Sequence, residues 1–339
     1  ATEHHDEARL ALEFFLGTDS NTDGFFRNEI GMPYRISACR YFGNGQEEGD
    51  YNHDGPNVET DGWGLVLWGA RTYLHYSCNR DWLETLSWRG DTIYEALLNI
   101  AENIRDTRIG GLPLPDASIW EVHWNRRQQF AYTAASQIRG LYDFADIARW
   151  KGEEATADEY EAIADEMLEK SRDFLVYDPT KSIASHAGLA SSVYHADGST
   201  VEFLAWGLIP TDDPIYNGTL QGYGRLLTNN GGYRRLDPNV SLTGEGSASE
   251  YDLAEWILLD LRIGQAWRDF GDSSKGDYQL DVVTDQALAN DLLIPELFNP
   301  DDGRYAGEIP MVGYGAGAWM MTQLHKYGDP GPIYDQGFD

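Results

Sequence analysis

Apolar residues recur every three or four positions along most of the chain, which is the pattern of amphipathic helices. Over 128–150 this spacing places Phe130, Ala134, Ile138 and Leu141 on one face. The same pattern predicts helices over 5–16, 61–76, 81–88, 91–104, 156–175, 200–206, 212–227, 247–270, 281–293 and 313–325. Asp81 and Asp91 are expected as N-caps. Short strands are expected at 191–195 and 232–236.

The helices alternate with loops and lack a heptad repeat, so the pattern excludes a coiled coil. A long segment over 25–56 is rich in Gly, Asn, Asp and aromatic residues, and loops of this length usually carry function. The length of 339 residues alone suggests about two domains. Because no linker or low-complexity tract divides the chain, we expect one domain over 1–339.

The charge of the chain narrows the choice of partners. The formal net charge is -31 and the pI is about 4.4, which argues against nucleic acid or an anionic membrane as partner. No run of eighteen apolar residues is present, so we expect no membrane span. The acidic surface fits either a salt-adapted protein or an acidic secreted enzyme. We expect a processed protein that is secreted or on the cell surface.

Two further features leave alternatives open or predict no site. Cys39 and Cys78 allow one disulfide or two buried thiols. The segment 19–24 has the spacing with which a calcium loop begins, but Ile30 stands where a bidentate Glu is needed. We therefore expect a polar turn there. No metal site and no cofactor are predicted.

Candidate chemistry begins with Glu121, which follows Trp120 and precedes His123 and Trp124 in a loop with nearby prolines. We expect the two indoles to desolvate this carboxyl group, an environment that suits a general acid. The alternative is a solvated loop glutamate beside tryptophans that fill the core. A second carboxyl, Glu296, lies 175 residues later between a predicted helix and a turn. Inverting glycoside hydrolysis uses two such groups, roughly 6.5–9.5 Å apart.

Four segments together resemble the glucoamylase-type family of glycoside hydrolases, family 15. Ile119-Trp120-Glu121, followed by the helix from Gln129, resembles the family's acid motif. Thr60-Asp61-Gly62 is similar to its Asp-Gly helix start. The other two segments are Gly232-Tyr233-Arg234-Arg235 with Gly244-Glu245-Gly246, which resembles the arginine segment, and Pro295-Glu296-Leu297, which resembles the segment of the catalytic base.

The resemblance implies an all-α fold, an (α/α)6 barrel, and an inverting glycoside hydrolase that degrades oligo- or polysaccharide. It implies that Glu121 is the general acid and Glu296 the general base. The implied substrate-binding residues are Asp61, Trp63, Trp120, His123, Trp124 and Arg234. The expected reaction is exo-acting cleavage of α-glucosidic bonds.

The chain also departs from the family's pattern. It has no counterpart of the first barrel helix, so this helix is expected either to be absent or to be supplied by a separate N-terminal segment that completes the barrel. Val122 stands in place of a second Glu, Leu297 in place of Gln, and Tyr314-Gly315 in place of a Trp-Ser type pair. Val122 is expected to change the leaving-group subsite, and the other two substitutions affect the choice of substrate. The missing first helix leaves a barrel without catalysis as an alternative.

Two other functions compete with hydrolysis. A polysaccharide lyase on a similar toroid would use His123 or Tyr132 to abstract a proton, but it needs a cationic cleft, which this acidic chain disfavours. A carbohydrate-binding or catalytically degenerate barrel would use Trp63, Trp120 and Trp124 as stacking platforms without an acid–base pair.

Overall fold

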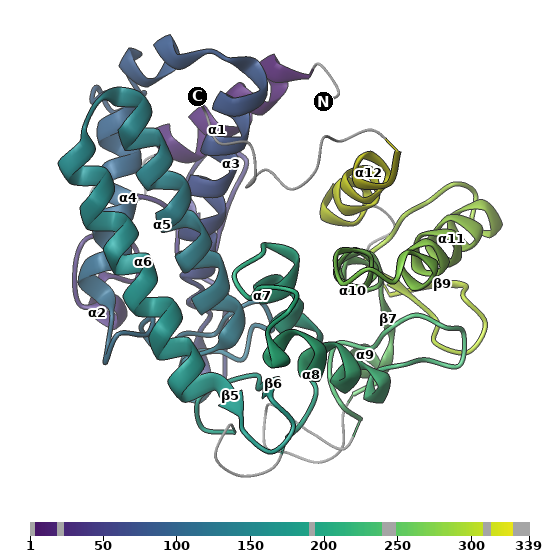
Figure 1. The fold of residues 1–339 in the computed structure, drawn as a ribbon. Coiled ribbons are helices and arrows are strands. Elements are labelled where there is room, and N and C mark those ends of the chain that lie inside the picture. The colour runs from purple at the N-terminus through teal and green to yellow at the C-terminus, as the bar shows by residue number, and fades with distance from the viewer. Residues whose placement is uncertain (1–3, 19–23, 190–193, 239–248, 308–312, 328–339) are drawn as a thin grey trace. The chain divides into compact units, whose positions relative to one another are not determined.

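The computed structural model describes residues 4–18, 24–189, 194–238, 249–307 and 313–327 (Figure 1). Contacts between residues divide the chain into two compact units, Ala1–Phe174 and Leu175–Asp339, here called the N-terminal and C-terminal units. Each is described by itself, and the expected single domain remains a prediction. Within the described residues no helix is long and apolar enough to span a membrane.

Helices dominate the N-terminal unit. They are α1 (His5–Gly17), α2 (Arg27–Ile30), α3 (Asp61–Ser77), η1 (Arg80–Glu84), α4 (Ile93–Thr107), η2 (Trp124–Arg126), α5 (Ala131–Lys151) and α6 (Glu154–Leu175). The helices predicted over 5–16, 61–76, 128–150 and 156–175 are confirmed. Two small hairpins, β1 (Arg40–Tyr41) with β2 (Glu47–Glu48) and β3 (Tyr51–Asn52) with β4 (Gly55–Pro56), form the long loop before α3.

Helices α3 and α5 pack together at two glycines. A Cβ added to Gly64 would lie 2.0 Å from the carbonyl oxygen of Ser136, and one added to Gly140 would lie 2.6 Å from Cα of Gly64. The backbones therefore approach each other at a distance that only glycine allows. This contact fixes the start of α3 relative to α5, and both helices border the candidate site.

The predicted Asp caps of two helices are wrong. The segment after Asp81 forms only the short 3₁₀ helix η1, and α4 begins at Ile93 with Thr92 as its N-cap. Thr92 and Glu95 form a capping box, which satisfies two backbone N–H groups at once and so outcompetes an Asp cap. Asp91 instead forms an ion pair with the buried guanidinium of Arg35.

The C-terminal unit contains shorter helices and a small antiparallel sheet. Its elements are β5 (Val176–Tyr177), β6 (Ser182–Ile183), η3 (Gly198–Val201), α7 (Glu202–Ala205), α8 (Pro214–Gly222), η4 (Tyr223–Arg225), α9 (Glu250–Leu253), β7 (Glu255–Trp256), α10 (Ile257–Asp269), α11 (Ser273–Ala289), β8 (Leu297–Phe298), β9 (Tyr305–Ala306) and α12 (Gly313–Tyr327). The predicted helices over 281–293 and 313–325 correspond to α11 and α12.

The continuous helix predicted over 247–270 is wrong. The chain is extended at Glu255 and Trp256, where β7 pairs with β8, and β8 pairs in turn with β9. Pairing with a distant strand overrides the helical periodicity here. Because β7 pairs with β8, the apolar residues of α10, which follows β7, pack against Phe298 of β8. The resulting core contains Ile257, Leu261, Leu280, Val283, Phe298 and Ala318.

Other expectations of local structure also change. Residues 232–236 form isolated bridges, Tyr233 with Leu227 and Leu236 with Asp197, and no regular strand. The segment 200–206 is split between η3 and α7, and α8 begins at Pro214 after the cap Asp213. Most of 19–24 and of 191–195 lies outside the described residues. Both cysteines are free; Cys39 is partly buried and Cys78 is exposed.

Candidate functional site

The loop that carries Glu121 has a strained backbone. Ser118, Glu121 and His123 all have positive φ values, of 52°, 52° and 63°. Side chains other than glycine adopt this region rarely, and such residues cluster at functional sites. The loop is held at its base, where the backbone of Asp116 pairs with Gln128. The surrounding structure thus maintains a conformation that the local sequence does not favour.

The carboxylate of Glu121 faces solvent and an arginine. Its side chain is 50% exposed, and Oε1 accepts a hydrogen bond of 3.0 Å from Arg40 on β1. Arg40 also binds Asp50 at 2.9 Å. The expectation that flanking indoles desolvate Glu121 is therefore wrong. Trp120 is only 4% exposed, and the ring of Trp124 lies under the guanidinium of Arg127.

Three further carboxyl groups of the N-terminal unit, those of Asp61, Asp116 and Glu59, form a cluster with Glu121. Burial raises the pKa of Asp61 to about 6, and the charge of Glu121 adds to this effect. Burial and the charge of Asp61 raise the pKa of Asp116 to about 8. Burial, followed by the charges of Asp61, Glu121 and Asp116, raises the pKa of Glu59 well above its ordinary value. Part of this cluster therefore stays protonated at neutral pH.

Asp116 connects three segments of the N-terminal unit. Its Oδ2 accepts hydrogen bonds from the backbone N–H of Thr60 at 2.8 Å and from the hydroxyl of Thr60 at 2.9 Å. Its Oδ1 accepts from the hydroxyl of Thr133 on α5 at 3.0 Å. Asp116 thereby fixes the start of α3, where Asp61 lies, relative to the loop of Glu121.

Two other residues predicted from the sequence have structural partners. The Nδ1 of His123 donates to the carbonyl of Gly55 at 3.0 Å, because a carbonyl can only accept. This bond ties the loop of Glu121 to β4. Trp63 is fully buried, and its indole N–H donates to the carbonyl of Ile36 at 3.2 Å. The ring of Trp63 therefore belongs to the core and offers no face to a sugar, contrary to the expectation.

Glu296 lies in the C-terminal unit, directly before β8. Its backbone carbonyl accepts from Ile257 at 3.4 Å, and its carboxylate accepts a hydrogen bond of 2.6 Å from the hydroxyl of Tyr314. The neighbouring strand residue Trp256 donates its backbone N–H to Tyr233, the residue before Arg234. The segments of Arg234 and Glu296 thus lie on either side of β7.

Arg234 is held by its own segment. One Nη donates to the carbonyl of Leu227 at 2.5 Å, while its Nε is buried and has no hydrogen-bond partner among the described residues. Beneath the strand, the fully buried side chain of Glu255 accepts from Thr228 at 3.0 Å. Burial and then the charge of Glu255 raise the pKa of Asp260 well above its ordinary value.

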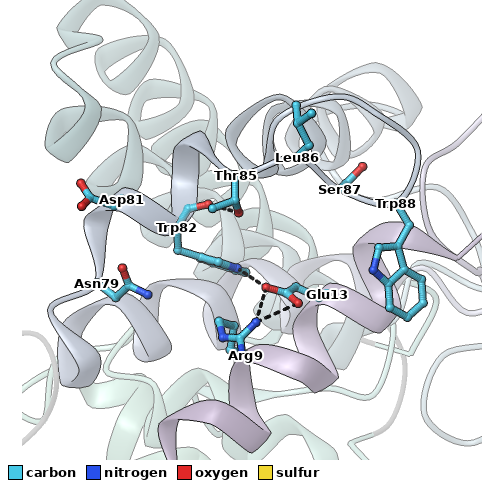
Figure 2. Close-up of a pocket in the computed structure, with 9 residues that line it drawn as sticks. All are labelled: Arg9, Glu13, Asn79, Asp81, Trp82, Thr85, Leu86, Ser87 and Trp88. Carbon is cyan, nitrogen blue, oxygen red and sulfur yellow. Dashed lines mark hydrogen bonds and ion pairs between the residues drawn. The ribbon is translucent and has the colours of Figure 1, made fainter.

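A pocket of about 390 Å³ lies elsewhere in the N-terminal unit, between α1 and η1 (Figure 2). Figure 2 shows Glu13 at its centre, where the carboxylate accepts from the indole of Trp82 at 3.1 Å and from Arg9 at 2.9 Å. None of the predicted site residues lines this pocket. Among the residues that the structure describes, no group of three or more His, Cys, Asp or Glu side chains is arranged to hold a metal ion.

Comparison with solved structures identifies the fold. A wild-type glycosidase matches 96% of the chain with a TM-score of 0.65 at 19% sequence identity, over 81% of its own length. A glucoamylase from Saccharomycopsis fibuligera matches 94% with a TM-score of 0.63 at 15% identity, over 79% of its length. The chain has an all-α fold of the (α/α)6-barrel class.

A third similar structure is a bacterial glucoamylase in complex with acarbose, with a TM-score of 0.65 and 17% identity over 94% of this chain and 48% of that one. No protein-family profile matches the sequence, and no curated protein sequence matches it. At these identities the likeness establishes the fold and leaves the chemistry to be argued from the residues.

Sequence reasoning missed three groups that contact or influence the predicted acid and base: Arg40, Glu59 and Tyr314. Arg40 lies in the long loop that was singled out for its length, but its partner 81 residues away carries no local signal. Glu59 lies two residues before the recognised Asp61. Tyr314 was noted only as a departure from the family's pattern.

Proposed function

We propose that the protein is an inverting glycoside hydrolase that cleaves α-glucosidic bonds in an exo mode, with Glu121 as general acid and Glu296 as general base. The likeness of nearly the whole chain to structures named glycosidase and glucoamylase carries the proposal. The motif residues support it, because the side chain of Glu121 is 50% exposed and that of Glu296 is partly exposed, so that both carboxyl groups are accessible to solvent.

In the proposed reaction, the carboxyl of Glu121 gives its proton to the oxygen of the leaving sugar as the glycosidic bond breaks. Glu296 takes a proton from a water molecule, whose oxygen bonds to the anomeric carbon from the opposite side. The proposal requires the two carboxyl groups to act on the same bond.

The surroundings of Glu121 give Arg40 a place in the proposed cycle. Arg40 pairs with Glu121 in the resting structure, so the leaving oxygen must take the place of this guanidinium beside the carboxyl group. Displacement of the guanidinium frees Oε1 of Glu121 for a hydrogen bond with the leaving oxygen.

We assign substrate contacts to Asp61, Trp120, His123, Trp124 and Arg234. Trp63 is left out because its ring is fully buried. Arg234 is suited to sugar hydroxyls because its guanidinium carries several donors, of which one Nη is engaged by the carbonyl of Leu227. The protein is proposed to be secreted or on the cell surface.

The test of the reaction class uses two readings on the same sample. Maltooligosaccharides and a uronate polymer are incubated with the protein, and both reducing ends and the absorbance of unsaturated products are followed. A hydrolase releases reducing ends alone, a lyase gives both signals, and a binding protein gives neither. Proton NMR of the first product then identifies the mechanism, because inversion of an α-linkage yields the β-anomer first. An initial α-anomer would refute inversion.

A further inference from the structure

The carboxylate of Glu296 is held by one hydroxyl group. Tyr314, in the first turn of α12, donates to Oε1 of Glu296 at 2.6 Å. This length is typical of a hydroxyl that donates to an ionised carboxylate, which is among the stronger hydrogen bonds in proteins. Among the described residues, no other side chain hydrogen-bonds this carboxylate. Oε1 is thus engaged, and no side chain of the described residues bonds Oε2.

The residue after Tyr314 brings the helix to this position. A Cβ added to Gly315 would lie 3.1 Å from the carbonyl oxygen of Pro295 and 3.5 Å from Cγ2 of Ile294. The first turn of α12 therefore packs directly on the two residues before Glu296. A larger residue at 315 would push the turn away from this backbone.

The rest of α12 packs against the core and α11, which fixes the position of its first turn. Ala318, one turn after Tyr314, is 5% exposed and belongs to the core that contains Phe298 of β8. The indole N–H of Trp319 donates to the hydroxyl of Thr284 on α11 at 3.0 Å. Strand β8 and helix α12 therefore pack on the same core. The acceptor Glu296 lies directly before the strand, and the donor Tyr314 lies in the first turn of the helix.

We infer that Tyr314, seated by Gly315, is the positioning residue of the base Glu296. The phenol holds Oε1 and favours the ionised carboxylate, so that Oε2 accepts the proton of the attacking water. The phenol keeps its own proton throughout; the water loses one proton to Glu296, and its oxygen bonds to the anomeric carbon. This inference rests on the proposed function of Glu296 and adds a role for the Tyr-Gly pair that departs from the family's pattern.

The first test replaces Tyr314 by Phe, which removes only the hydroxyl. We expect kcat to fall by roughly tenfold to a hundredfold, the range of a hydrogen bond to a charged group. KM should change little. The acidic limb of the pH–rate profile should move to higher pH, because the carboxylate form of Glu296 loses its donor. Tyr327→Phe, at the exposed far end of the same helix, should leave kcat and the pH profile unchanged.

The second test perturbs the hydrogen bond between Tyr314 and Glu296 by displacing the backbone of the first turn of α12. Gly315→Ala introduces the Cβ that meets Pro295, whereas a Cβ at Gly317 meets nothing within 4 Å. Gly315→Ala should lower kcat and move the acidic limb as Tyr314→Phe does, and Gly317→Ala should do neither. Thermal unfolding of each variant shows whether it is folded. If Tyr314→Phe fails to fold, the comparison of Gly315→Ala with Gly317→Ala tests the role of Tyr314 in its place.

Failure of this inference is distinguishable from failure of the proposed function through Glu296→Gln. An active Glu296→Gln variant would overturn the proposed function itself. An inactive Glu296→Gln combined with a Tyr314→Phe variant of wild-type rate and pH profile would overturn only the role of Tyr314. A lower kcat with an unmoved pH profile in folded Tyr314→Phe would equally overturn positioning by hydrogen-bond donation.

Discussion

Replacing Asp116 by Asn should make the stability of the protein less dependent on pH. The carboxyl of Asp116 is fully buried, and burial with the nearby charge of Asp61 raises its pKa from 3.8 to about 8. The folded protein therefore binds the proton of Asp116 more tightly than the unfolded chain. This contribution to stability is complete below about pH 4 and is lost as the pH rises toward 8.

The size of the effect follows from the shift. Each unit is worth about 1.4 kcal/mol, so the wild type should lose roughly 3–4 kcal/mol through this group between pH 5 and pH 8. Asn has nearly the same shape. Its oxygen can accept the bonds from Thr60, and its amide can donate to the hydroxyl of Thr133. The variant should therefore fold while lacking the titration.

Urea denaturation of the wild type and Asp116→Asn at pH 5 and pH 8 measures the difference. Asp61 also has a raised pKa, of about 6, so some pH dependence should remain in the variant. Asp173→Asn, a change at an exposed helix position, should behave as the wild type. If the free energy of unfolding falls equally between the two pH values in the wild type and Asp116→Asn, the assignment of a buried, protonated Asp116 is wrong.

Three further predictions concern stability. Phe298→Ala should lower the free energy of unfolding by about 3–5 kcal/mol, because it empties a fully buried position in the core between β8 and α10; a loss below about 1 kcal/mol in urea denaturation would contradict that packing. Thr92→Ala should lower the free energy of unfolding by about 1 kcal/mol, because it removes the capping box of α4. In a peptide that spans α4, Thr92→Ala should lower the helix content and Asp91→Ala should not. With a net charge of -31, the melting temperature should rise between 0.01 M and 1 M salt, as the Debye length falls from about 30 Å to about 3 Å; a flat response would end the salt-adaptation interpretation.

The helical fold could be predicted because periodicity is a local property. Helices α3 and α5 carry apolar residues at regular spacing, and the structure confirms both. The prediction of one long helix over 247–270 is wrong because Glu255 and Trp256 form a strand that pairs with β8, about 40 residues later in the chain. Periodicity contains no information on such a partner. The cap of α4 was misplaced although its Thr92-x-x-Glu95 signature was visible in the sequence.

The site was predicted in part. The sequence motif located Glu121 and Glu296, but the surroundings of each depend on distant residues. Two indoles beside Glu121 suggested desolvation, whereas the chain turns the carboxylate toward Arg40 through a positive φ. Neighbours in sequence do not determine the direction of a side chain in a strained loop. Trp63 shows the opposite error, since its place in a recognised motif suggested a sugar platform and its ring is buried.

The acid–base assignment is tested most directly by the rates of two variants on two substrates. Glu121→Gln removes the proton donor and leaves the base, whereas Glu296→Gln removes the group that activates water. Wild type and both variants are assayed on a maltooligosaccharide and on an aryl α-glucoside, whose acidic leaving group departs without protonation.

Glu121→Gln should lower kcat/KM on the maltooligosaccharide by about a hundredfold to ten-thousandfold, the usual contribution of a general acid, and should retain far more activity on the aryl glucoside. Glu296→Gln should abolish hydrolysis of both, because water attack is needed whatever group leaves. Hydrolysis of the maltooligosaccharide by Glu121→Gln at the wild-type rate would contradict the account at its centre.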